Sequence, residues 1–64
     1  MLRLKRKKLM LSQSAASKIL GIDNTYLSLI ENKKRFHINN TLFLKICLVY
    51  QITIDELNFF LNSK

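Results

Sequence analysis

The only glycine of this 64-residue chain, Gly21, constrains the fold most, because it divides a helical pattern into two short pieces. A glycine just past the end of a helix adopts a left-handed backbone at the lowest energetic cost. We therefore predict one helix over residues 13–20 and a second over residues 24–31, joined by a tight turn. Ser12 and Asp23 stand where a side chain accepts hydrogen bonds from the first backbone N–H groups, so each is expected to cap one helix.

The helix expected over residues 24–31 has one apolar and one polar side. At about 100° per residue, Leu27 and Ile30 point in the same direction, toward a core. The opposite side suits the major groove of DNA, where amides and hydroxyls meet base edges and an apolar group meets a thymine methyl. The residues on this side or on its flanks are Asn24, Thr25, Tyr26, Ser28, Leu29 and Asn32.

The segment from Ser12 to Lys34 contains four short groups at fixed spacings, namely Ser-Gln, Leu-Gly-Ile-Asp, Leu-Ser and Ile-Glu-Asn-Lys-Lys. Together they resemble the helix-turn-helix of the Cro/C1-type phage repressors, also called the XRE family, with the motif at residues 12–32. The resemblance extends over nearly the whole chain. It implies an all-α fold, namely a compact five-helix, lambda-repressor-like DNA-binding domain, and a single domain over residues 1–64.

The resemblance and the polar helix face together suggest which side chains contact double-stranded DNA. The expected base-reading residues are Asn24, Thr25, Tyr26, Ser28 and Leu29. Asparagine can pair with adenine through two hydrogen bonds and leucine can touch thymine methyls, which predicts an A/T-leaning site. Contacts to phosphates are expected from Gln13, at a helix N-terminus that suits an anion, and from Asn32, Lys33, Lys34 and Arg35. The alternative for Gln13 is a polar surface residue without such a contact.

Two further expectations concern structural residues of the motif. Arg6 lies on the inner side of a further helix expected over about residues 2–9, and the resemblance implies that it forms an ion pair with Glu31. Lys33 stands where the family usually has glycine. A left-handed turn there would cost lysine about 1 kcal/mol, so either the loop differs from the family pattern or the chain bears this strain.

Three more helices are predicted from apolar periodicity and capping residues. The first covers about residues 2–9, the next starts near Asn39 or Asn40 and runs to Tyr50, and the last opens at Thr53 with a capping box. The core residues expected outside residues 24–31 include Ala16, Ile19, Leu20, Phe43, Ile46, Cys47 and Tyr50.

Phe59 and Phe60 are adjacent, so the two rings cannot both face a small core. Both are candidates for a homodimer contact, because one exposed aromatic ring on a small domain indicates an interface. The alternative is that both rings cover the end of the domain.

The net charge of +7 predicts a polyanionic partner, with nucleic acid first and an anionic membrane surface second. The charge gathers in residues 3–8 and 33–35. A single cysteine allows no internal disulfide, which fits a reducing cytoplasm. The longest apolar stretch, residues 42–50, is too short to span a membrane, and the apolar run after the basic start is too short for a signal peptide. His37 has no second ligand at zinc spacing, so no metal is expected.

The leading hypothesis is a cytoplasmic, nucleoid-associated transcription regulator of bacterial or phage origin, more often a repressor, that binds a palindromic operator as a homodimer. One alternative is an antitoxin-type regulator or other protein-interaction module that uses the surface of the last two helices. Another is a membrane-active basic peptide, which the short, capped helices disfavour. An enzyme is excluded because four acidic residues, one histidine and one cysteine form no convergent set. No cofactor and no small-molecule ligand are expected.

Overall fold

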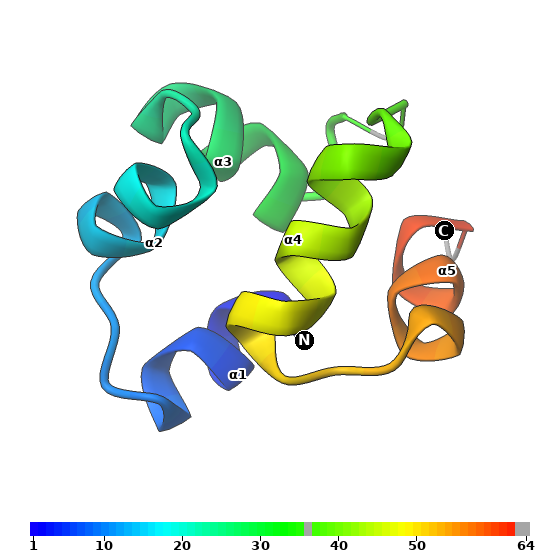
Figure 1. The fold of residues 1–64 in the computed structure, drawn as a ribbon, viewed down its shortest axis with the longest axis horizontal. Coiled ribbons are helices and arrows are strands. Elements are labelled where there is room, and N and C mark those ends of the chain that lie inside the picture. Colours follow the sequence, from blue (N-terminus) through cyan, green and yellow to red (C-terminus); the bar gives the residue numbers. More distant parts are fainter. Residues whose placement is uncertain (36, 63–64) are drawn as a thin grey trace.

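The computed structural model describes residues 1–35 and 37–62, which form five helices and contain no strand (Figure 1). The all-α fold expected from the sequence is confirmed. Helix α4 stands between α5 on one side and α2 and α3 on the other, and it packs against α1, α2 and α5. The helices are α1 (Leu2–Lys8), α2 (Gln13–Leu20), α3 (Asn24–Glu31), α4 (Asn40–Tyr50) and α5 (Ile54–Asn62).

Side-chain caps begin three of these helices. The Ser12 hydroxyl accepts a hydrogen bond from the backbone N–H of Ala15 at 3.0 Å, as predicted for α2. The Asn39 amide oxygen does the same at the start of α4. At α5, the capping box is present, because Thr53 and Glu56 each accept the backbone N–H of the other.

The prediction for Asp23 is wrong in one respect. Asp23 is the residue before α3 and has an extended backbone, but its carboxylate accepts no hydrogen bond from the helix. The N–H groups at the start of α3 are therefore left for solvent or a ligand, since no cap occupies them.

Residues with a left-handed backbone follow the ends of α2 and α3. Gly21 has φ of 73°, as expected for the turn between α2 and α3. Lys33 has φ of 60°, so the chain adopts the left-handed turn after α3 without a glycine and bears the strain.

The prediction that Ile19 belongs to the core is wrong, because this residue is 57% exposed. The buried face of α2 runs through Ala16, Ser17 and Leu20, which turns Ile19 about 100° away from the core direction. Ser17 is buried because its small side chain fits the close contact, and its hydroxyl donates to the Ser14 carbonyl one turn earlier. The apolar core consists of Leu2, Ala16, Leu20, Leu27, Ile30, Leu42, Ile46, Cys47, Tyr50, Ile52, Leu57, Phe60 and Leu61.

The two adjacent phenylalanines of α5 differ in exposure, as expected for neighbouring residues of one helix. Phe60 is 3% exposed and belongs to the core, whereas Phe59 is 76% exposed. Phe60 is therefore ruled out as a surface residue for a dimer contact, and Phe59 is left. Within residues 1–35 and 37–62, no helix reaches the length and apolarity needed to cross a membrane, and no three His, Cys, Asp or Glu side chains gather as a metal site would need.

Candidate nucleic-acid interface

The orientation of α3 is fixed by its buried side. Leu27 and Ile30 are fully buried, and Glu31 is buried at the end of the helix. The remaining residues therefore face outward or lie at the margin, with Leu29 38% exposed among them. At the far end, the Asn32 amide donates to the Ser28 hydroxyl at 3.2 Å, which orients both side chains along this face. The exposed or half-buried residues of the face are Asn24, Thr25, Tyr26, Ser28, Leu29 and Asn32.

The turn that follows α3 folds back onto that helix. The backbone N–H groups of Lys34 and Arg35 both donate to the Leu29 carbonyl, at 2.8 and 3.2 Å. The three basic side chains of this turn then take different places. The Lys33 ammonium lies 5.0 Å from the centroid of the Phe60 ring, toward α5. The Arg35 guanidinium lies 5.1 Å from the centroid of the Tyr26 ring, and Lys34 is exposed.

A buried polar cluster joins α3 to three other helices through the Glu31 carboxylate. Arg6 donates to it twice, from Nε at 2.8 Å and from Nη2 at 3.1 Å, so the ion pair expected from the family resemblance is present. The Tyr50 hydroxyl of α4 and the Gln13 amide of α2 also donate to it. The remaining Arg6 donor, Nη1, binds the Leu11 carbonyl at 3.1 Å, so the whole cluster is hydrogen-bonded.

The electrostatics of this cluster favour its ionised form. Burial raises the pKa of the Glu31 carboxyl, but hydrogen bonds from Arg6 and Tyr50 outweigh burial and leave the pKa below its usual value. The hydrogen bond to Glu31 raises the pKa of Arg6. Burial, followed by the hydrogen bond to Glu31, raises the pKa of Tyr50. Arg6 and Glu31 therefore stay charged and Tyr50 stays a neutral donor at neutral pH.

The placement of Gln13 differs from a simple surface glutamine. Its side chain is half-buried, and its Nε2 lies 3.4 Å from Glu31 Oε1. The second N–H of the same amide group is available at the N-terminal end of α2, where backbone N–H groups suit an anion. A small hollow opens beside it, lined by Arg3, Arg6, Gln13, Ser28, Glu31 and Asn32.

Sequence reasoning missed three of these placements. Apolar periodicity predicts Tyr50 as a core residue of α4 and says nothing about its hydroxyl. Arg3 belongs to the basic run of residues 3–8, and its place beside α3 depends on how α1 packs. The contact of Lys33 with Phe60 joins residues 27 positions apart, which no local pattern reveals.

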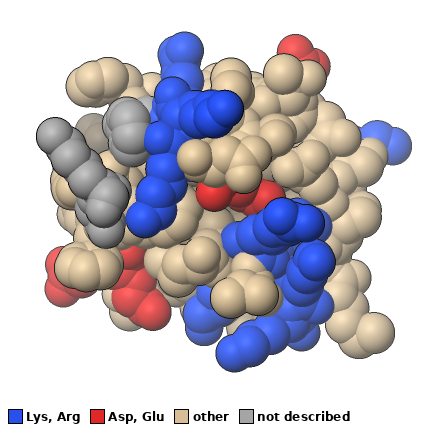
Figure 2. Space-filling model, turned by 180° about the vertical axis from the view of Figure 1, so that it is seen from behind, with Lys and Arg blue, Asp and Glu red and all other residues tan. Residues whose placement is uncertain are grey.

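Basic side chains gather on one face of the molecule. Figure 2 shows Lys and Arg in two groups on this face, with a small acidic patch between them. The exposed basic residues of segments 3–8 and 33–35 include Arg3, Lys7, Lys8, Lys34 and Arg35. Such a surface attracts a polyanion, because Lys and Arg side chains neutralise phosphate charges.

Comparison with protein families matches residues 2–57 to a family described as Helix-turn-helix. The match covers α1 to α4 and the first half of α5. Comparison with curated proteins and with solved structures gives no match.

Proposed function

The chain belongs to the Cro/C1-type helix-turn-helix family of DNA-binding transcription regulators, and from this premise we propose that it is a repressor that binds a palindromic operator as a homodimer. The observation that carries the proposal is the face of α3. Leu27 and Ile30 are buried, whereas its small polar residues and Leu29 are exposed or half-buried. Arg3 lines the hollow beside Ser28 and Asn32, and a basic turn follows the helix. This is the composition that a helix needs to lie in the major groove.

Contacts to base edges fall to the outward side of α3. Asn24 and Thr25 are exposed at its first turn, the part of a recognition helix that reaches deepest into the groove. Ser28 and Leu29 continue the same side one turn later. An asparagine amide matches adenine and a leucine matches a thymine methyl, which favours an A/T-leaning site.

Contacts to phosphates frame this helix. We assign them to Gln13 at the start of α2, Asn32 just after α3, and Lys34 in the following turn, because these side chains are exposed or half-buried at the ends of the two helices. Lys33 contributes charge but no close phosphate contact in this arrangement, because its ammonium lies over Phe60. Such contacts set the register of the protein on DNA without selecting a sequence.

A homodimer places two recognition helices in successive major grooves, about one helical turn apart. We assign the contact between the two copies to α5, where Phe59 exposes most of an aromatic ring. The protein acts in the cytoplasm at the nucleoid, and it represses by occupying the operator.

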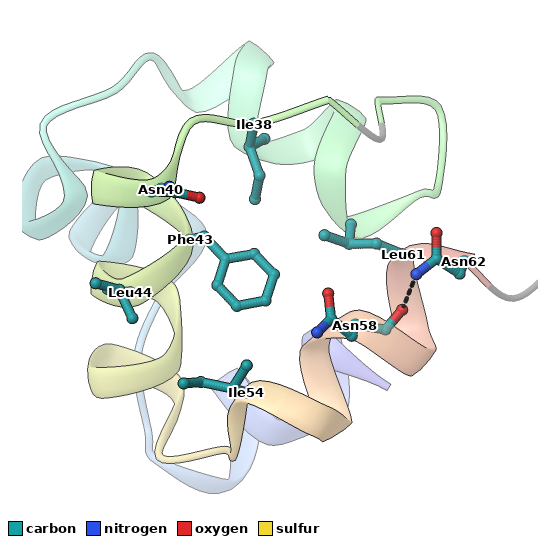
Figure 3. Close-up of a pocket in the computed structure, with 8 residues that line it drawn as sticks. All are labelled: Ile38, Asn40, Phe43, Leu44, Ile54, Asn58, Leu61 and Asn62. Carbon is teal, nitrogen blue, oxygen red and sulfur yellow. Dashed lines mark hydrogen bonds between the residues drawn. The ribbon is translucent and has the colours of Figure 1, made fainter.

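A second candidate function is the binding of another protein, as an antitoxin-type regulator does. The exposed leucines of α4 favour it, since Leu48 is 79% exposed and Leu44 is half exposed. Leu44 also lines a pocket between α4 and α5 (Figure 3). Both candidates bind an operator. They differ in what covers the exposed leucines of α4, because only the second candidate requires another protein on this surface.

The test is selection of duplexes from a random library by the full chain, at low and at near-physiological salt. We expect an enriched, palindromic site that is still bound at the higher salt. Thr25→Ala should weaken binding to it by about tenfold, as loss of a base contact does, whereas Thr41→Ala on α4 should not. Uniform binding that disappears with salt would reflect phosphate attraction alone and would overturn the proposal.

A further inference from the structure

Arg35 and Tyr26 form a preassembled pair at the edge of the DNA-facing surface. We propose that Tyr26 is a positioning residue, which holds the Arg35 guanidinium beside α3 with its N–H edge directed to a pair of acceptor atoms on DNA. The inference rests on the proposed function and deepens it, because it gives Tyr26 a role other than reading a base and makes Arg35 an oriented contact instead of a general charge.

Tyr26 is a rigid support for a cation. It is the third residue of α3, and its half-buried ring packs against the apolar core cluster. The Arg35 guanidinium lies over this ring, 5.1 Å from its centroid. A cation over a tyrosine ring is attracted by the negative face of the ring, and guanidinium also stacks on it.

The backbone brings Arg35 to this ring. Its N–H donates to the Leu29 carbonyl, which fixes the backbone of this residue at the last turn of α3. Tyr26 lies almost one turn closer to the N-terminus of the same helix, so the Arg35 side chain runs back along α3. The guanidinium therefore lies over the ring of Tyr26, the third residue of α3. The N-terminal residues of such a helix are the ones that approach base edges in this mode of binding.

Stacking leaves the hydrogen-bonding edge of the guanidinium available. A guanidinium that stacks on an aromatic ring uses its flat face, whereas its five N–H donors lie in the plane. In the part of the chain that the structure describes, the one ion pair joins Arg6 to Glu31, and Arg35 has no carboxylate partner. Two parallel N–H groups match two phosphate oxygens or the O6 and N7 atoms of guanine, which share this acceptor geometry.

Neighbouring basic residues do not have this arrangement. The Lys33 ammonium lies over Phe60 and carries its donors toward α5. Lys34 is exposed, and an ammonium on a flexible stem acts as a point charge. Arg35 is therefore the residue of this turn whose charge is both oriented and adjacent to α3.

The experiment is a double-mutant cycle on binding to the duplex that the wild-type chain selects. Arg35→Ala should weaken binding by about tenfold, as expected for loss of a bidentate contact. Tyr26→Leu, which keeps apolar packing, should weaken it about threefold by loss of the support. In the Arg35→Ala background, Tyr26→Leu should have little further effect. Tyr26→Phe keeps the stacked ring and should bind like the wild type.

The control is Lys34→Ala, in whose background Tyr26→Leu should keep its full effect. Additive effects of Tyr26→Leu and Arg35→Ala would overturn the inference, and so would a Tyr26→Phe loss as large as that of Tyr26→Leu, since the hydroxyl would then make the contact. If the wild-type chain selects no sequence, the proposed function itself fails, which distinguishes that result from failure of the pair.

Two further readouts separate the sources of the acceptor pair. A selection repeated with Arg35→Ala should lose preference at one G·C pair if the contact is to guanine. A uniform loss across sequences, with a smaller dependence on salt, should appear if the contact is to a phosphate. In the protein alone, NMR should show upfield ring-current shifts of the Arg35 side-chain protons in the wild type and in Tyr26→Phe. Their absence from the wild type would overturn the pairing.

Discussion

The Tyr50 hydroxyl of α4 donates a hydrogen bond to the Glu31 carboxylate at the end of α3. This contact ties the candidate recognition helix to the central helix of the fold, and Arg6 completes the pairing from α1. The orientation of α3 therefore depends on a buried charged cluster as well as on Leu27 and Ile30.

Removal of the tyrosine hydroxyl tests this connection. Tyr50→Phe leaves the ring packed but takes one donor from a buried carboxylate, so we expect about 2 kcal/mol lower free energy of unfolding. Urea unfolding measures it. Tyr26→Phe is the matched control, because among the described residues the Tyr26 hydroxyl has no hydrogen-bond partner, and it should change stability by less than about 0.5 kcal/mol.

The Arg6–Glu31 pair should show strong coupling. Arg6→Met leaves Glu31 buried without its cation, and we expect a loss of about 3 kcal/mol. The double variant Arg6→Met with Glu31→Gln should lose less than the sum of the two single changes, because no unpaired charge is left. Thermal unfolding of the four proteins gives the coupling, and strict additivity would show that the pair contributes nothing as a pair.

The free energy of unfolding should decrease at acid pH, because the buried Glu31 carboxylate becomes protonated. The pKa of this carboxyl is lowered in the folded state, so its stabilisation is fully present above its unfolded pKa, near 4.5, and is lost as the pH falls through the lower folded value. Urea unfolding between about pH 6 and pH 3 should show this decline, and Glu31→Gln should flatten it. The pKa of Glu56 is also lowered, by hydrogen bonds with Thr53, so Glu56→Gln is needed to separate the two contributions.

Because Lys33 has a left-handed backbone, replacing it by alanine and by glycine should change the stability of the protein by different amounts. Lys33→Ala keeps the strained backbone and loses the contact with Phe60, so it should destabilise the protein by up to about 1 kcal/mol. Lys33→Gly loses the same contact but removes the strain, so it should be more stable than Lys33→Ala by about 1 kcal/mol. Equal stability of the two variants would mean that φ of 60° carries no strain at this position.

The exposed ring of Phe59 should matter for assembly but not for folding. Phe59→Ser should shift the protein toward monomer in sedimentation equilibrium and weaken operator binding by about tenfold or more, because two half-sites would no longer be held together. Ile19→Ser removes a similarly exposed apolar side chain from α2 and should leave the oligomeric state unchanged. If Phe59→Ser leaves the dimer unchanged, the assignment to Phe59 is wrong, and the exposed leucines of α4 become the candidates for the contact.

Local rules determined the helices of this protein. The glycine after Leu20, the hydroxyl of Ser12 and the capping box at Thr53 act over a few residues, so their effects follow from the sequence. The apolar spacing in α3 likewise determined which side is buried. The local rule for a cap failed at Asp23, because a polar side chain at the surface can bond to water instead at little cost.

The tertiary structure decided what depends on contacts between distant segments. The direction in which α2 packs exposed Ile19, and the position of α5 selected Phe60 over Phe59 for the core. The same packing brought Tyr50 to Glu31, Lys33 to Phe60 and Arg35 to Tyr26. Local patterns record the periodicity of one element, whereas these contacts depend on the angles at which elements meet, and so only the folded chain shows which of its cations lie close to α3 and which are held elsewhere.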